Sequence, residues 1–130
     1  MRWLIPLLAG PYLEQVCWSP YREGVEIHDF GIKPGDATQP LPAALLRYRP
    51  GASVPRHRHG GFEYILVLRG SQRDDAGEYG SGSLLVSAPG SEHTVESPEG
   101  CVVLAFWQKP VTFVALGPSS RGVTDGRPPW

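Results

Sequence analysis

Residues 51–70 read GASVPRHRHGGFEYILVLRG, a stretch of extended-type sequence with a glycine at each end. His57 and His59 are separated by one residue, so on an extended strand both imidazoles project to the same face. Gly60 and Gly61 then allow the chain to bend back, and Glu63 opens the next apolar run. The segment therefore predicts three potential metal ligands gathered around one bend.

Strand-like sequence continues on both sides of this segment. Short apolar or alternating runs between turn residues predict strands at Val25–Phe30, Ala43–Arg49, Glu63–Arg69, Leu84–Ala88, Thr94–Ser97, Cys101–Gln108 and Val111–Leu116. The 130 residues include 16 glycines and 14 prolines, well above their usual combined share of about 12%. Such frequent breaks argue against a helical bundle, and the only helical pattern is a turn near Tyr12–Cys17. We predict an all-β fold, an antiparallel barrel or jelly roll.

The length of 130 residues fits one domain with a core of its own. We expect an N-terminal arm over about residues 1–24, a barrel over about 25–116 and a loosely held tail over 117–130. An apolar arm of this kind would cover a sheet of its own subunit or of a neighbouring one, and we expect a homodimer. The arm residues proposed for this contact are Trp3, Leu4, Ile5 and Leu8.

Charge and hydropathy argue against some classes of partner. Thirteen acidic residues against twelve Lys and Arg give a net charge of −1, which provides no basic field for nucleic acid. The longest apolar run, Trp3–Ala9, contains Pro6 and is far shorter than the roughly 20 residues that span a bilayer. Cys17 and Cys101 match no metal or redox spacing, and we interpret them as buried free thiols of a cytoplasmic protein.

A fourth potential ligand, His93, begins another strand-like run beside the Pro89-Gly90 turn. Three imidazoles and one carboxylate suit one borderline divalent ion such as Zn, Fe, Mn, Ni or Co. In an octahedral arrangement, four protein ligands leave two positions for water or substrate. Taken alone, His57 and His59 fit ordinary hydrogen-bonded histidines, or solvent-exposed ones beside Arg56 and Arg58, better than metal ligands.

The segment at 51–70 resembles the first cupin motif without a gap, with its landmarks at Gly51, His57, His59, Glu63 and Gly70. The later run GSLLVSAPGSEHTVES resembles the second cupin motif, with His93 as its histidine. Two positions depart from that motif: Ala88 occupies the usual proline position, and Ser97 stands where many cupins carry Asn. The resemblance covers residues 43–115. It implies a double-stranded β-helix whose barrel holds one metal ion on His57, His59, Glu63 and His93.

A narrower likeness joins the runs GGFEYILVLRGSQRDDAGEYGSGSL and APGSEHTVESPEGCVVLAFW to the cupin domain of ChrR-type anti-sigma factors. In that family a separate N-terminal zinc-binding helical domain grips the sigma factor. These 130 residues contain no His and Cys cluster to serve as such a domain. We therefore do not expect sigma-factor control to carry over from the resemblance.

Other residues have a functional and a structural interpretation. Arg47 or Arg49 would anchor a carboxylate if it pointed inward, although an outward, solvated arginine is the commoner case. His28 has no partner at ligand spacing and is interpreted as a surface or strand-edge residue. The acidic group Asp74, Asp75 and Glu78 fits a polar hairpin tip better than a second cation site. The candidate pocket residues are Arg47, Tyr48, Phe62, Tyr64, Trp107 and Gln108.

Two functions from different classes fit these observations. The first is a metal-dependent enzyme, of the oxygenase type, that acts on a small oxygen-rich molecule at the free metal positions, with Glu63 as the candidate proton acceptor. The second is a sensing or regulatory module that binds a small ligand or reacts with an oxidant without catalysis. The metal would be Zn, Fe, Mn or Ni, and a redox role would exclude Zn. We prefer the enzyme by a narrow margin.

Overall fold

A computed structural model describes residues 2, 4–32 and 43–114, and this part of the chain is built almost entirely of strands. Helix α1 is short, covering Tyr12–Gln15. The strands are β1 (Ser19–Arg22), β2 (Val25–His28), β3 (Ala43–Tyr48), β4 (Ala52–His59), β5 (Glu63–Asp74), β6 (Gly77–Gly80), β7 (Leu84–Ser87), β8 (Glu92–Ser97), β9 (Cys101–Trp107) and β10 (Val111–Phe113).

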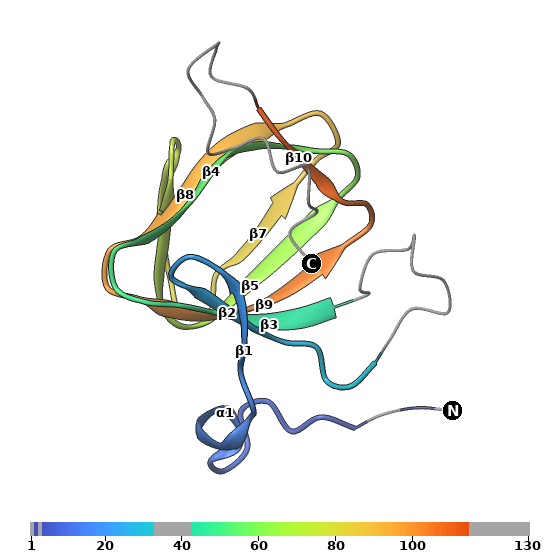
Figure 1. Ribbon diagram of the computed structural model, residues 1–130, viewed down its shortest axis with the longest axis vertical. Coiled ribbons are helices and arrows are strands. Elements are labelled where there is room, and N and C mark those ends of the chain that lie inside the picture. The colour runs from blue at the N-terminus through green and yellow to red at the C-terminus, as the bar shows by residue number, and fades with distance from the viewer. Residues whose placement is uncertain (1, 3, 33–42, 115–130) are drawn as a thin grey trace.

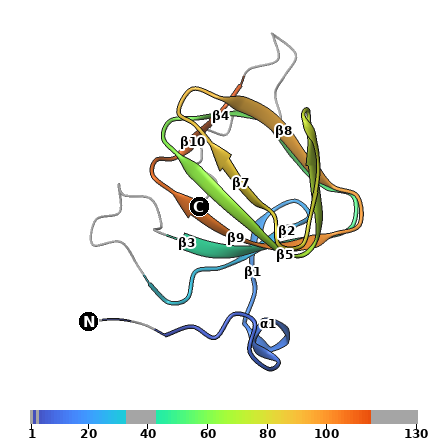
Figure 2. The same cartoon turned by 180° about the vertical axis from the view of Figure 1, so that it is seen from behind.

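The strands curl into a ring, and every strand pairing is antiparallel (Figure 1). Their order is β1-β2-β3-β9-β5-β8-β4-β10, with β6 and β7 paired to β5. Strand β5 contacts both halves of the ring, because its first part pairs with β9 and β7 while Arg73 pairs with Glu96 of β8. The view from behind shows the β5–β6 hairpin standing beside β8 (Figure 2). This arrangement confirms the predicted all-β jelly-roll barrel.

The barrel interior is filled by alternate residues of facing strands. In β3, Leu46 and Tyr48 are buried, while Arg47 between them is partly exposed, as the period of two predicts. Val67 and Val103 are fully buried cross-strand partners on β5 and β9. These side chains belong to one core cluster that also contains Val25, Ala44, Val54, Ile65, Val95, Cys101, Ala105 and Trp107.

Residues of the N-terminal segment cover part of the outer face of the barrel. A second apolar cluster joins Leu13 of α1 to Leu45, Leu68 and Leu104, with Leu7 packed against it. Leu4 and Leu8 do not make this contact within the subunit, since both are highly exposed, and their contact with a neighbouring subunit stays a prediction. Trp3 lies outside the described residues. The segment does more than cover the barrel, because β1 within it extends the sheet next to β2.

Most predicted strands are present, with shifted ends. Three strands were not predicted: β1, β6 and β4, although the argument from His57 and His59 assumed extended backbone there. Pro55 within β4 and glycines at both ends of β6 weaken the strand signal of these segments. The prediction for Val25–Phe30 is too long, because the chain turns at Phe30, which has a positive φ of 62°. The end of the run at Val111–Leu116 lies outside the described residues.

Strand β5 is longer than predicted because Gly70, expected to end it, lies within it. Gly70 has φ of 72°, and a Cβ atom there would lie 2.0 Å from the carbonyl oxygen of Gly100. Only glycine permits this close approach of two strands. The pairing with β9 shifts by one residue between Val67 and Arg69, which marks a β-bulge at Leu68. The bulge lets both Glu63, before it, and Gln72, after it, line the same cavity.

Both cysteines are free, but the prediction that both are buried is wrong for Cys17, which is exposed. Cys101 is buried in the core, and burial raises the pKa of its thiol. His28 lies at the end of β2, where its Nδ1 donates to the carbonyl of Cys17 at 2.9 Å. Within the described residues, no helix has the length and apolar character needed to cross a bilayer.

Candidate metal centre

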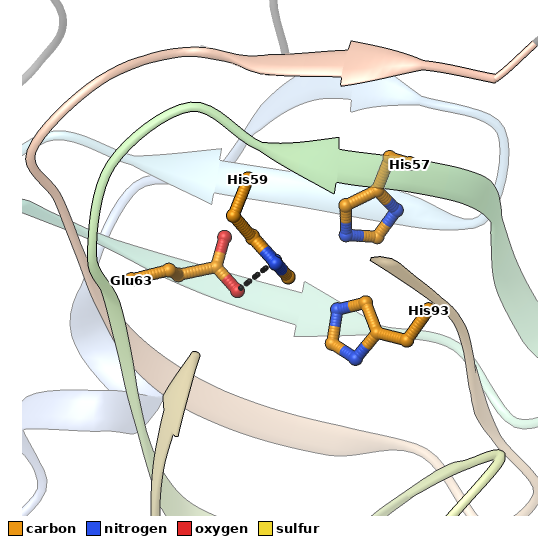
Figure 3. A group of neighbouring side chains, drawn as sticks. All are labelled: His57, His59, Glu63 and His93. Atoms are coloured by element: carbon orange, nitrogen blue, oxygen red, sulfur yellow. Dashed lines mark ion pairs between the residues drawn. The ribbon is translucent and has the colours of Figure 1, made fainter. Parts of the chain in front are cut away.

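Strands β4 and β8 bring two imidazoles directly opposite each other. His57 and His93 are cross-strand partners in this pair, and their ring centroids lie 4.6 Å apart. His59, two residues further along β4, projects to the same side, with its ring 4.7 Å from that of His93 and 5.2 Å from that of His57. Figure 3 shows the three rings turned toward one another. The predicted convergence of these side chains is present in the structure.

The Gly60-Gly61 turn brings Glu63 to the same point. A Cβ atom on Gly61 would lie 2.9 Å from Oε1 of Gln108, so glycine allows this side chain to pack against the turn. The same oxygen accepts a hydrogen bond from the backbone N–H of Phe62 at 3.0 Å. Trp107 Nε1 donates to Oε2 of Glu63 at 2.9 Å, which leaves Oε1 facing His59. Gln108 and Trp107 therefore hold the carboxylate in position from β9 and its end.

The Nδ1 atom of each imidazole is already engaged away from the centre. His57 Nδ1 donates to the carbonyl of Pro55 at 2.8 Å, and His59 Nδ1 lies 3.1 Å from the carbonyl of Ser91. His93 Nδ1 donates to the carboxylate of Asp74 at 3.2 Å. Because carbonyl and carboxylate oxygens accept, each Nδ1 carries the proton and each Nε2 presents a lone pair. This is the tautomer that a histidine ligand needs.

The electrostatics of the site favour a neutral imidazole at His57 and an ionised carboxylate at Glu63. Burial lowers the pKa of His57 from 6.5 to about 4, and the neighbouring histidines act in the same direction. Burial alone would raise the pKa of Glu63, but the close contact with the His59 ring and the nearby imidazoles hold it below its usual value. At neutral pH the centre therefore offers lone pairs and one negative charge, which is a donor set for a cation.

The four side chains pass a physical test for a metal site. Their ligand atoms all lie within 4.8 Å of one another. The buried Nε2 atoms of His59 and His93 have no hydrogen-bond partner among the described residues, although buried polar atoms are normally satisfied. Nε2 of His59 also lies 3.3 Å from Oε1 of Glu63 (Figure 3). Two acceptor atoms at this distance repel each other unless a cation lies between them. One divalent ion would satisfy all of these atoms together.

Sequence reasoning missed Asp74, which positions His93 from outside the ligand set. The residue was interpreted as part of a polar hairpin tip, and its carboxylate does accept from the N–H groups of Ala76 and Gly77 in that turn. Its other oxygen reaches His93 because the β5–β6 hairpin folds beside β8. Burial acts to raise the pKa of Asp74, but the Ala76 N–H and His93 keep it low and the carboxylate ionised. No local signal marks this contact.

A small cavity extends from the candidate metal centre into the barrel. His57, Glu63 and His93 line one end, and the predicted pocket residues Tyr48 and Trp107 are part of its wall. The space within it that water can occupy is about 40 Å³. One water needs about 10–15 Å³ by this measure, so the cavity has room for roughly three. Its size suits a ligand of a few non-hydrogen atoms.

Other predicted pocket residues do not line this cavity. Arg47 points away and donates to Glu26 at 2.7 Å, with its guanidinium over the ring of Trp18. Phe62 is 39% exposed and stacks on Tyr64 outside the barrel, and Gln108 instead holds the turn before Glu63. The arginine that does line the cavity is Arg22, next to Tyr21 on β1. Both belong to the segment that the sequence predicted to be an arm.

An antiparallel jelly-roll barrel with three imidazoles and one carboxylate gathered on its inner wall defines a cupin with a candidate metal site. The family model described as "ChrR Cupin-like domain" matches residues 12–112. This match spans most of the chain, from α1 into β10, and the chain therefore belongs to the ChrR cupin-like family.

Relatives agree with this assignment. The anti-sigma-E factor ChrR of Cereibacter sphaeroides is 34% identical over 114 residues, which are 85% of this chain and 50% of that protein. The crystal structure of Rhodobacter sphaeroides SigE in complex with the anti-sigma ChrR aligns with 33% identity and a TM-score of 0.59, over 72% of this chain and 50% of that one. The chain thus spans about half the length of this relative.

More distant structures share the fold alone. A putative acetylacetone dioxygenase from Methylibium petroleiphilum PM1 aligns with a TM-score of 0.68 at 18% identity, over 89% of this chain and 81% of that one. An acetylacetone dioxygenase from Acinetobacter johnsonii aligns with a TM-score of 0.65 at 16% identity, over 85% and 78% of the two chains. These likenesses support the barrel and say nothing about the reaction.

Proposed function

We propose that this chain is a metal-centred sensory domain of a regulatory protein. One divalent ion, Zn, Fe, Mn or Ni, is held by His57, His59, Glu63 and His93, and a small oxygen-donor ligand or oxidant binds at the remaining positions. When bound, the ion supplies Lewis acidity and, for the redox-active metals, electron transfer. The observation that carries the proposal is the set of Nε2 atoms, fixed by hydrogen bonds at Nδ1 and facing one carboxylate.

The size of the cavity and the relationship to ChrR favour sensing over turnover of a large substrate. Room for about three waters admits a small ligand and excludes a bulky one. The chain matches half of a protein named as an anti-sigma factor. Because the match covers only half of that relative, we do not propose that this chain binds a sigma factor. The proposal for this chain is that it responds to the ligand. The free thiols suit a reducing compartment, and we propose the cytoplasm.

We propose a homodimer as the assembled form. The outer face of β5, β7 and β9 carries an apolar strip in which Tyr64 is the cross-strand partner of both Val86 and Phe106. Uncovered apolar patches of this kind mark interaction surfaces, and dimers with twofold symmetry are the commonest assemblies. Light scattering of the purified protein tests this state. The exposed residues of the strip are Phe62, Tyr64, Leu84, Val86 and Phe106.

Elemental analysis of protein purified without a chelating tag tests the metal centre. We expect one divalent ion per chain in the wild type and almost none in His93→Ala. To test sensing, the loaded protein is treated with hydrogen peroxide, and amide hydrogen exchange in β4 and β8 is compared before and after. Faster exchange in these strands, without sustained consumption of the oxidant, supports a sensor. Repeated turnover contradicts it.

An oxygenase is the second candidate, because the apolar cavity opens directly onto Glu63 beside two of the imidazoles. In this alternative Glu63 is the catalytic residue that takes a proton from the substrate, and its low pKa keeps it ionised. Oxygen uptake by iron-loaded protein with β-dicarbonyl and catechol compounds tests it. Uptake that continues over many turnovers, and is lost in Glu63→Gln with the metal retained, favours the enzyme. Inertness with every metal excludes it.

A further inference from the structure

The hydroxyl of Tyr21 is a buried polar group that the metal centre does not use. Its oxygen is inaccessible to solvent and has no hydrogen-bond partner among the described residues, while its ring packs against the main core cluster. Leaving a buried hydroxyl unpaired costs about 1–3 kcal/mol. Such a group in a native protein normally has a partner that is a ligand or an ordered water. Tyr21 lines the cavity that leads to His57 and Glu63.

A β-bulge in β1 directs two consecutive side chains into this cavity. The pairing of β1 with β2 shifts between Pro20 and Arg22, so Tyr21 is the extra residue. Consecutive residues of a regular strand point to opposite faces, yet Tyr21 and Arg22 both line the cavity. Bulges occur next to functional sites because they redirect a side chain in this way. The irregularity thus adds a donor and a positive charge to the wall of the cavity that His57 and His93 also line.

Among the described residues, the charge of Arg22 is not neutralised by an acidic neighbour. Its guanidinium lies 4.5 Å from the ring centroid of Phe113, which in turn contacts the ring of His57 edge-on. Within residues 2, 4–32 and 43–114, no ion pair joins Arg22 to a carboxylate. A divalent ion with Glu63 as its only anionic ligand leaves a net positive charge at the other end. With an ion bound, the cavity would therefore be lined by two positively charged groups, the ion and Arg22.

The remaining walls are largely apolar, with Gln72 and Ser87 as further polar residues of the lining. Val25, Leu46, Val54 and Ile65 line the same cavity as the metal ligands and the two β1 residues. Hydrocarbon walls with a few placed polar groups are typical of sites for small organic ligands. Water or a fully polar anion has no apolar atoms to pack against these walls.

We propose that the cavity binds a small monocarboxylate of two or three carbons. Its anionic group accepts the hydrogen bond of the Tyr21 hydroxyl and is attracted by Arg22 and the ion, and its carbon atoms contact the apolar walls. This inference rests on the proposed metal centre, since the ion provides half of the positive charge. It names the chemical class of the ligand that the sensory site recognises.

Calorimetric titration of the metal-loaded protein with acetate and propionate tests the proposal. We expect saturable binding of both acids and none of acetamide or propionamide, which have similar shapes without the charge. Tyr21→Phe should weaken propionate binding about tenfold or more, because a hydrogen bond to a charged group is lost. Arg22→Gln should weaken it several-fold and reduce its dependence on salt.

Matched controls separate the ligand site from the metal centre. Tyr12→Phe alters a tyrosine packed outside the barrel, and Arg58→Gln alters an exposed arginine, so both should bind like the wild type. Metal content and thermal unfolding are measured on every sample. A fully loaded wild type that binds neither acid, or equal binding by Tyr21→Phe, overturns this inference and leaves the proposed metal centre intact. A wild type that takes up no ion overturns both.

Discussion

Two groups of residues line the cavity and differ in how their polar atoms are held. We call His57, Glu63 and His93, with the neighbouring His59, the imidazole end, and Tyr21 with Arg22 the Tyr21 end. At the imidazole end every Nδ1 atom has an acceptor from outside the ligand set, so the rings are fixed before any ion arrives. At the other end, the Tyr21 hydroxyl has no partner among the described residues and the Arg22 guanidinium rests on an aromatic ring. The first end is preorganised for one ion, whereas the second leaves its donors available.

The difference shows how two kinds of site are built on one barrel. The pairing of β4 with β8 shifts between Val54 and His57, and beyond this irregularity His57 and His59 share a face of β4 with His93 directly across from His57 on β8. An irregular strand places the second group, since Tyr21 and Arg22 share a cavity only through the bulge in β1. The imidazole end should therefore dominate stability and metal binding, and the Tyr21 end should affect neither strongly.

The largest expected effect comes from removing an imidazole. His57→Ala and His93→Ala should each lose the ion, and with it the stabilisation that bound metal gives, about 4 kcal/mol at a metal concentration 1,000 times Kd. Mass spectrometric metal analysis and thermal unfolding with added metal measure both effects. Arg58→Ala, on the exposed face of the same strand, is the control and should change neither. Unchanged metal content in both histidine variants would refute the ligand assignment.

The imidazole end should also set the acid sensitivity of the metal-free protein. His57 titrates near 6.5 when unfolded and near 4 when folded, so between these values the unfolded state binds more protons. Stability should be complete above pH 6.5 and should fall by roughly 3 kcal/mol as the pH drops to 4. Urea unfolding of chelator-treated protein at a series of pH values measures this. His57→Gln should flatten the profile, and an equally steep profile in that variant contradicts the assignment.

A smaller effect is expected from the carboxylate behind His93. Asp74→Asn should weaken metal binding by about 10–100-fold, the usual cost of altering a group that orients a histidine ligand. Competition with a chelator of known affinity measures the change. Asp75→Asn is a matched control, because that neighbour pairs with Arg56 on the surface at 2.9 Å. If both variants bind metal alike, Asp74 contributes only to the hairpin turn.

The smallest effect is expected at the Tyr21 end in the absence of ligand. Tyr21→Phe removes a buried hydroxyl without a partner, so the free energy of unfolding should stay unchanged or rise by up to about 1 kcal/mol. Tyr48→Phe is the contrasting variant, since its hydroxyl interacts with Gln72, and it should lose about 1 kcal/mol. Denaturant unfolding compares them. Equal losses would show that Tyr21 has a hydrogen bond of its own.

The fold and the ligand set could be predicted because they depend on short-range patterns. Residues two apart on a strand share a face, and the glycines at 60 and 61 permit the bend that returns Glu63 to His59. The cupin resemblance supplied the barrel that brings His93 across from His57. The shared face of His57 and His59 and the bend before Glu63 each depend on residues that are close together in the sequence.

The missed features depend on contacts between distant segments. Asp74 reaches His93 only after the β5–β6 hairpin folds beside β8, and Gln108 reaches the turn before Glu63 from the end of β9. Arg47 was a candidate pocket residue, but it lies on the outer side that alternation along β3 favours, where Glu26 on β2 holds it. Nothing local indicated Arg22 in its place. The sequence of β1, SPYR at residues 19–22, contains no pattern that predicts the bulge that turns Tyr21 and Arg22 inward.

The bulge at Leu68 reverses which alternate residues of β5 point into the barrel, so the two halves of the strand follow opposite patterns. Odd-numbered positions before it face the interior, as Glu63 and Ile65 do, whereas the even-numbered Gln72 faces the same cavity after it. Deleting one residue here would turn one half of the strand inside out, and either the Glu63 carboxylate or the Gln72 amide would face solvent. A length change that a surface loop absorbs easily is therefore forbidden in the middle of this strand. Any homologue that preserves both inward-facing groups must also preserve the number of residues between them, or change it in steps of two.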